Sequence, residues 1–153
     1  MQAAPPVRTF DRVMLAEKQR QMIEDLLVID DAQERLAFIA DRAKSRPPLP
    51  EALRREEHRV RGCVSAAWVV PELRGGRCHF AGDADSPLVR GLVLLLCDFY
   101  SEAAPSEVAS VEPALVEELG LSRMLSPTRL NGLRSVRAAI RDFAARQSQA
   151  AGP

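Results

Sequence analysis

The stretch that decides the fold is "VSAAWVVPELRGGRCHF", residues 64–80. It holds two runs with an extended pattern, which are joined by "RGG" at residues 74–76. Because glycine tolerates the positive dihedral angles of tight turns, this spacing predicts a β-hairpin. The preceding "HRV" at residues 58–60 extends the same pattern. The sequence therefore predicts a small three-stranded antiparallel sheet.

Helical patterns flank the predicted sheet on both sides. Upstream, apolar residues recur at three- and four-residue steps over 22–29 and 36–43, which predicts two amphipathic helices. Downstream, Ser86-Pro87 is typical of a helix start, because serine caps the first amides and proline suits the first turn. Residues 88–100 are apolar almost all round, so we expect a buried helix at the centre of the fold.

Further helices are predicted toward the C-terminus. Glycine inside a helix costs about 1 kcal/mol relative to alanine, so Gly91 indicates that another segment packs closely there. Residues 105–110 and 112–121 predict two short helices, and a long closing helix begins at Ser126-Pro127. Its apolar stripe consists of Leu133, Val136, Ile140 and Phe143. Helices, a small antiparallel sheet and more helices predict an α+β fold in which helices cover one sheet face.

Length and composition predict one domain with short extensions. The chain has 153 residues, of which 46% are hydrophobic, and this suits a single core. Residues 1–20 are expected to form a flexible or partly helical N-terminal arm. The domain itself is predicted over residues 21–146, and residues 147–153 are expected to be a flexible tail.

The charge balance bears on the class of partner. Acidic and basic residues number 21 each, so no strong overall field favours binding to nucleic acid or to a charged membrane. The longest uninterrupted apolar run, residues 92–97, is far shorter than the roughly 20 residues that cross a bilayer. The N-terminus also lacks the apolar core of a signal peptide. We therefore expect a cytoplasmic protein without a membrane span.

Cys63 is the candidate nucleophile. It follows Gly62, which permits a sharp bend, and it comes shortly after His58, Arg59 and Arg61. Nearby cations favour the thiolate, which is the nucleophilic form of cysteine. Free cysteine is also among the most buried residue types and packs as a small hydrophobe. The residues alone leave both interpretations of Cys63 open.

The other cysteines point to packing rather than to chemistry. Cys97 lies in the predicted central helix. Cys78 and His79 are neighbours on a predicted strand, so their side chains face opposite sides of the sheet and cannot bind one metal ion together. A metal site needs three or four converging ligands, and the spacing of the three cysteines shows no metal signature. Zinc or cluster binding is therefore a weak hypothesis. An odd number of cysteines without a C-x-x-C pair indicates free thiols.

Three stretches in order point to a known family. They are "RVRGCVSAAW" at 59–68, "FAGDADSPLVRGL" at 80–92 and "ELGLSRMLSPTRLNGL" at 118–133. In order and spacing they resemble the SufE family of sulfur-acceptor proteins in iron–sulfur cluster assembly. The resemblance runs from about residue 21 to residue 145. It also implies the fold shared with IscU-type scaffold proteins, in which helices cover a three-stranded sheet.

The resemblance implies a role for five residues. Through the motif G-C-x-S-x-x-W, which includes Gly62 and Ser65, Cys63 aligns with the cysteine that accepts sulfane sulfur as a persulfide. Asp85 in G-D-x-D and Arg129 in L-S-P-T-R-x-x-G-L match positions associated with that site and with partner contact.

The residues themselves suggest a simpler role for the aspartates of G-D-x-D. Asp83 and Asp85 are expected to cap the helix that begins at Ser86 and to complement its dipole. Arg129, on the first turn of the last helix, is oddly placed for that helix's dipole, which favours acids there. We therefore expect Arg129 either to be solvated or to pair with a carboxylate such as Asp85.

The same resemblance implies the partners. It predicts a sulfur carrier that takes persulfide sulfur from a SufS-like cysteine desulfurase, stimulates that enzyme and passes sulfur toward an iron–sulfur scaffold. Such a protein is a transfer partner rather than a stand-alone enzyme, has no resident cofactor or metal, and is a monomer or a homodimer. In family members the cysteine lies on a loop that shields it until the desulfurase docks.

Two alternatives stay open beside the carrier. One is an IscU-like scaffold, which would use three cysteines for a cluster or zinc. The other is an adaptor that occupies the desulfurase without accepting sulfur. The chain also departs from the family pattern at Val64, Ala66 and Ala67, where members commonly carry glutamine, a polar residue and valine. These departures concern the choice of partner more than the chemistry of the cysteine.

Overall fold

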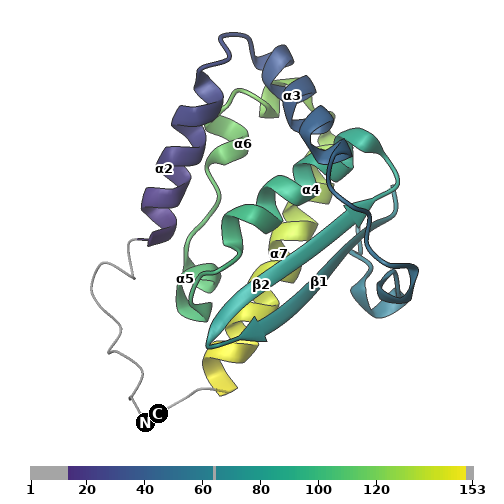
Figure 1. Cartoon of the computed structure of the whole chain (residues 1–153), viewed down its shortest axis with the longest axis vertical. Helices are drawn as coiled ribbons and strands as arrows, with labels where there is room; N and C mark the ends of the chain where they lie inside the picture. Colours follow the sequence, from purple (N-terminus) through teal and green to yellow (C-terminus); the bar gives the residue numbers. More distant parts are fainter. Residues whose placement is uncertain (1–13, 64, 151–153) are drawn as a thin grey trace.

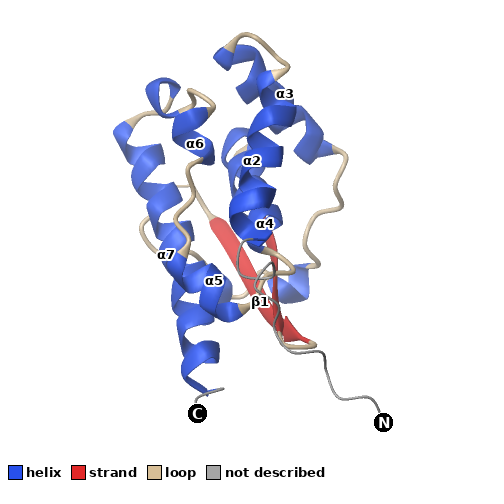
Figure 2. Cartoon of the chain, turned by 90° about the vertical axis from the view of Figure 1, so that its left-hand side faces the viewer, coloured by secondary structure: helices blue, strands red, loops and turns tan. Residues whose placement is uncertain are grey.

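The computed structural model describes residues 14–63 and 65–150. Helix α4 (Pro87–Tyr100) lies at the centre and contacts the hairpin, α3 (Ala32–Lys44) and α7 (Pro127–Ala150). Figure 1 shows the hairpin in front of α7 and beside α4, and Figure 2 shows α4 between α3 and α7. The remaining helical segments are α2 (Met14–Leu27), η1 (Glu51–Leu53), η2 (Glu56–His58), α5 (Pro105–Ser110), α6 (Leu115–Glu118) and η3 (Ser122–Met124). The α+β class is confirmed.

The predicted hairpin is present. Strands β1 (Ala67–Arg74) and β2 (Arg77–Ala84) pair antiparallel, with Ala67 opposite Ala84 and Arg74 opposite Arg77. Gly75 and Gly76 have φ angles of 57° and 78°, which is the left-handed conformation that glycine adopts readily. Side chains at the start of β1 alternate between buried and half-buried, so one face of the hairpin contributes to the core.

The prediction of a third strand is wrong within the described residues. Their sheet has two strands, and "HRV" contributes only a bridge between Arg59 and Trp68, beside a hydrogen bond of 2.8 Å from the Val60 amide to the Ala67 carbonyl. The chain is still in the 3-10 helix η2 up to His58, and it turns at Gly62, where φ is 91°. Too few residues lie between these two features to continue the ladder.

Helix α4 has the expected start and the expected burial. The Ser86 side chain accepts a hydrogen bond of 3.5 Å from the Val89 amide, and Pro87 opens the first turn. A Cβ atom added at Gly91 would lie 2.9 Å from the Cα of Ala40, so the close approach of another segment is confirmed. Here that segment is α3, which packs directly on the backbone of α4.

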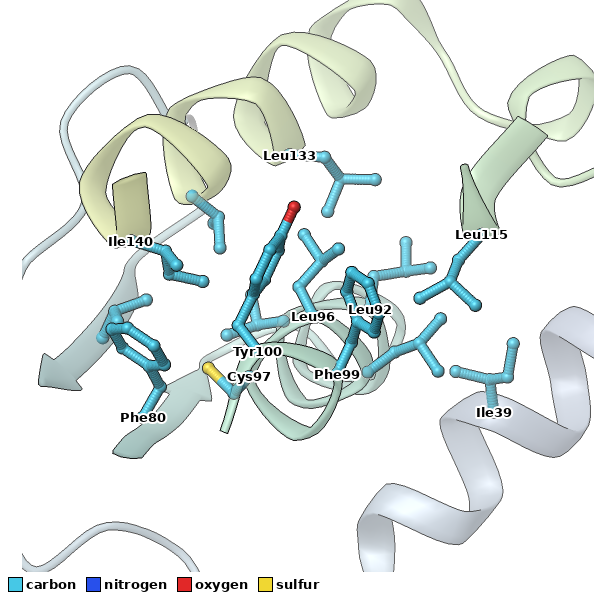
Figure 3. Packing of buried hydrophobic residues seen from close by; sticks show 14 of the residues in the cluster. Ile39, Phe80, Leu92, Leu96, Cys97, Phe99, Tyr100, Leu115, Leu133 and Ile140 are labelled. Atoms are coloured by element: carbon cyan, nitrogen blue, oxygen red, sulfur yellow. The ribbon is translucent and has the colours of Figure 1, made fainter. Parts of the chain in front are cut away.

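The core forms around α4 (Figure 3). The labelled side chains of Phe99 and Tyr100 lie between α4 and the segments above it, and both are fully buried. Tyr100 satisfies its hydroxyl by donating to the Val111 carbonyl at 2.7 Å. The predicted stripe of α7 faces this core, and Phe143 packs edge-on against Phe80 with ring centroids 5.8 Å apart. The core therefore joins the sheet, α4 and α7.

The ends of the predicted domain fall inside helices. Helix α2 begins at Met14, within the expected arm 1–20, and α7 continues to Ala150, within the expected tail 147–153. Residues 1–13 and 151–153 lie outside the described residues. The division into arm, domain and tail stays a prediction. None of the described helices is long and apolar enough to span a membrane.

Candidate functional site

Cys63 lies on the loop that connects η2 to β1. Gly62 reverses the chain immediately before it, with a φ of 91° that few other residues adopt. The Cys63 side chain is half-buried, packs against the hydrophobic core and donates from its Sγ to the Gly132 carbonyl at 3.5 Å. The candidate nucleophile is therefore in contact with α7, although 69 residues separate the two in sequence.

A cavity of about 230 Å³ adjoins this sulfur. Its polar lining comprises Cys63, Ser65, Ser126, Thr128 and Arg129. Its apolar lining comprises Val89 and Leu92 from α4 and Leu133 and Val136 from α7, and Gly132 completes the wall. The cavity thus places a thiol between an apolar surface and several groups that can donate hydrogen bonds.

Burial raises the pKa of the Cys63 thiol. The sequence suggested the opposite direction, because His58, Arg59 and Arg61 come just before the cysteine. In the structure these three residues line a separate groove of about 500 Å³ between the loop and α7. Their charges do not line the cavity beside the sulfur, so loss of hydration decides the direction of the shift.

Of the other predicted site residues, Gly62, Ser65 and Arg129 lie beside Cys63, whereas Asp85 does not line its cavity. Ser65 and Arg129 line the same cavity as the sulfur, and Gly62 shapes the loop beside it. Asp85 does not line this cavity, although its amide donates to the Ala66 carbonyl at 3.0 Å. Within residues 14–63 and 65–150, no ion pair joins Asp85 to Arg129, so of the two expected states of Arg129 the structure shows the solvated one. Both side chains are exposed.

The expected caps of α4 also differ from the structure. Ser86 caps the helix, and Asp83 is buried instead of capping it. The Asp83 carboxylate accepts from Arg54 at 2.5 Å and from Arg90 at 2.7 Å, as well as from two backbone amides. Burial alone would raise the pKa of Asp83, but these hydrogen bonds outweigh it and lower that pKa. The G-D-x-D motif therefore supplies a structural anchor through its first aspartate.

Sequence reasoning missed Gly132 and the apolar wall of the cavity. A Cβ atom at Gly132 would lie 3.2 Å from the Cys63 Sγ, and one at Gly62 would lie 2.7 Å from the Ser135 Oγ. Two glycines therefore let the loop approach α7. The signal was available, because a glycine in the middle of a long helix is unfavourable unless something packs there, as at Gly91. The sequence did not identify Cys63 as the residue that packs against Gly132.

The three cysteines do not converge on a common site. Cys78 and Cys97 are buried, and burial raises the pKa of Cys78 to about 11 and that of Cys97 to about 12. Among the described residues, no group of three or more histidine, cysteine, aspartate or glutamate side chains could hold a metal ion. The described residues therefore offer no set of ligands for the cluster or zinc that an IscU-like scaffold would bind.

Comparisons with known proteins agree on the family. The SufE profile, described as an Fe-S metabolism associated domain, matches residues 20–144. An uncharacterized SufE-like protein of Rhizobium etli is 36% identical over 129 residues, covering 81% of this chain and 87% of that protein. One from Rhizobium meliloti is 32% identical over 121 residues, covering 76% of this chain and 86% of that protein.

A solved structure shows the same fold. The solution structure of a hypothetical protein from Thermus thermophilus superposes with a TM-score of 0.69 at 23% identity, covering 85% of this chain and 95% of that chain. At this identity the likeness concerns the fold alone. The family follows from the profile match and the two relatives. The chain belongs to the SufE family, whose domain is associated with Fe–S metabolism.

Proposed function

We propose that this protein accepts sulfane sulfur from a SufS-like cysteine desulfurase on Cys63, stimulates that enzyme and passes the sulfur on for iron–sulfur cluster assembly. The observation that carries the proposal is the position of the Cys63 sulfur. It is half-buried at the wall of a cavity of about 230 Å³, whereas Cys78 and Cys97 are enclosed in the core. Only a sulfur with adjoining space can meet a second reactant.

The transfer is a thiol–disulfide type of exchange. The Cys63 thiolate attacks the outer sulfur of the donor's persulfide, and a new S–S bond forms between the two sulfurs. The S–S bond within the donor persulfide breaks, and the donor leaves as a thiolate that takes up the proton released by Cys63. Sulfur oxidation states are exchanged between the two proteins, so no external oxidant or reductant is consumed.

The cavity suits the product of this exchange. A persulfide extends the side chain by one S–S bond of about 2 Å, which is small relative to the adjoining space. The apolar side chains of Val89, Leu92 and Val136 cover one side of the cavity and would shield the terminal sulfur from water and bulk thiols on that side. Arg129 lines the same cavity and offers a positive charge to a persulfide anion. Because this chemistry needs free thiols, a reducing compartment such as the cytoplasm suits it.

The surface beside the loop offers charge for steering a partner. Arg59 and Arg61 are exposed just before Cys63, whereas Arg54 pairs with Asp83 and Arg55 pairs with Glu57. Exposed charges at an interface act mainly on the rate of encounter, and salt screens them. We therefore expect a transient, salt-sensitive association with the desulfurase.

A mass measurement tests the proposal. The protein is incubated with cysteine and a SufS-like cysteine desulfurase, and its intact mass is recorded under non-reducing conditions. The wild-type protein should gain sulfur, whereas Cys63→Ser should not. Cys78→Ala is the matched control and should still gain sulfur, because Cys78 is buried away from the cavity. Equal loading of Cys63→Ser would contradict the proposal. Binding of the desulfurase without loading of the wild type would favour an adaptor.

A further inference from the structure

The geometry points to Gly132 as a positioning residue for Cys63. Its bare Cα and its carbonyl oxygen form a seat on α7 that holds the sulfur as a protonated thiol, and ionisation of the thiol releases the sulfur from this seat. The chemistry of the released sulfur rests on the proposed function, whereas the seat itself rests on the contacts between the loop and α7.

The seat is built from two close approaches. The Cys63 Sγ lies against the position where a side chain at residue 132 would begin, because a Cβ there would be 3.2 Å from the sulfur. One helical turn further along α7, Ser135 faces Gly62, and a Cβ on Gly62 would be 2.7 Å from the Ser135 Oγ. Glycine on both sides of the contact is thus what lets the loop lie on the helix.

The hydrogen bond at the seat distinguishes the two ionisation states. As a thiol, Cys63 donates to the Gly132 carbonyl at 3.5 Å. A thiolate has no hydrogen to donate, and its charge faces the negative end of the carbonyl dipole at the same distance. The seat therefore favours the thiol and is lost when the proton leaves.

The positive charge nearest the sulfur within the cavity lining belongs to α7. Arg129 on α7 lines the cavity, while α4 contributes the apolar Val89 and Leu92, and the loop contributes the neutral Ser65. The remaining lining residues, Ser126, Thr128, Leu133 and Val136, are uncharged, so Arg129 is the one charged side chain among the described residues that line this cavity. A thiolate that leaves Gly132 moves away from a repelling carbonyl into a cavity that Arg129 also borders. Burial raises the pKa of the seated thiol, which agrees in direction with a seat that favours protonation.

Alkylation kinetics test the seat without a desulfurase. Gly132→Ala places a methyl carbon 3.2 Å from the sulfur, so the sulfur must shift by a few tenths of an ångström, which weakens its hydrogen bond to the Gly132 carbonyl. We expect Cys63 to react with iodoacetamide roughly 3- to 10-fold faster at neutral pH, with the midpoint of its rate–pH profile at lower pH than in the wild type. Asn131→Ala is the matched control, because it raises helix propensity in the same turn while its side chain is exposed. Its rate and midpoint should equal those of the wild type.

A second pair of variants tests the loop side. Gly62→Ala should also speed alkylation, because its methyl group displaces the Ser135 Oγ and a φ of 91° is strained for alanine directly beside Cys63. Gly76→Ala carries a similar backbone penalty, with φ at 78°, but has no other atom within 4 Å of the added carbon, so it should leave the rate unchanged. Unchanged or slower alkylation in a folded Gly132→Ala protein would overturn the inference. So would equal rates for Gly62→Ala and Gly76→Ala.

Sulfur loading of the same variants separates this inference from the proposed function. If the wild type never gains sulfur but Gly132→Ala alkylates faster, the seat stands and the carrier function fails. If the wild type gains sulfur and Gly132→Ala alkylates like the wild type, the carrier function stands and the seat fails.

Discussion

The Asp83 network and the Cys63 cavity lie near the same end of the hairpin and are built in opposite ways. The Asp83 carboxylate, only 1% exposed, accepts hydrogen bonds from the side chains of Arg54 and Arg90 and from two backbone amides. Cys63 is half-buried, makes one sulfur hydrogen bond to Gly132 and borders open space. One region ties segments together, and the other leaves a reactive atom loosely held.

The difference teaches where this fold is rigid. Arg90 donates not only to Asp83 but also to the Arg46 carbonyl at 3.0 Å, and Arg54 stacks over the Trp68 ring at 5.1 Å. The network therefore clamps the long segment after α3 onto the hairpin. A group with this many partners moves only at high energetic cost, whereas a single sulfur hydrogen bond is weak. We expect stability to depend on the network and chemistry to depend on the cavity.

Removal of the Asp83 carboxylate should give the largest effect. Asp83→Ala leaves Arg54 and Arg90 without their shared partner in a mostly buried site, which should lower the free energy of unfolding by about 3 kcal/mol. Urea unfolding followed by circular dichroism measures this loss. Asp41→Ala is the control, because it breaks only the exposed pair with Lys44 and should cost less than about 0.5 kcal/mol. Equal small losses for both variants would show that the network does not clamp the fold.

Acid should also destabilise the Asp83 network, by less than the Asp83→Ala substitution does. The pKa of Asp83 is lowered in the folded protein from its ordinary value of 3.8, so its contribution is fully present above that value and is lost as pH falls through the folded pKa. Urea midpoints measured from neutral pH down to about pH 3 should therefore fall more steeply in the wild type than in Asp83→Asn. Parallel curves would mean that other carboxylates carry the acid sensitivity.

Replacement of the cysteine should change stability least. Cys63→Ser replaces a polarisable sulfur with an oxygen at a half-buried site and keeps a donor for the Gly132 carbonyl, so the free energy of unfolding should change by less than about 1 kcal/mol. The urea titration used for Asp83→Ala measures it under the same conditions. A loss as large as that of Asp83→Ala would make Cys63 a structural residue and would remove the contrast between the two regions.

Local features of the fold were predictable from particular residues. Ser86 and Ser126 cap their helices because a serine oxygen reaches the first free amides, whatever the rest of the chain does. Gly75 and Gly76 turn the hairpin because they adopt positive φ without a steric penalty. Gly91 indicated a close contact by its cost inside a helix.

Predictions that required knowledge of the surroundings were the ones that failed. The third strand is absent from the described sheet because a strand needs a partner ladder, and η2 and the turn at Gly62 leave no length for one. Arg59 and Arg61 are close to Cys63 in sequence, but they line a different groove, so their charges were assigned to the wrong place. Asp83 was expected to cap α4 because it comes just before Ser86, but it is buried and pairs with Arg90 of that helix and with Arg54, which is 29 residues away in sequence.

By itself, the sequence determined the main helices and their serine caps, the hairpin and its turn, and the identity of the one cysteine that follows a glycine at the entrance to a strand. Only the tertiary structure decided that Cys63 lies against Gly132, that its thiol is shielded rather than exposed to the preceding cations, and that a cavity adjoins it. The physical reason is the range of the interactions. Caps and turns depend on neighbours within a few residues, whereas hydration and free volume around an atom depend on every segment that packs there.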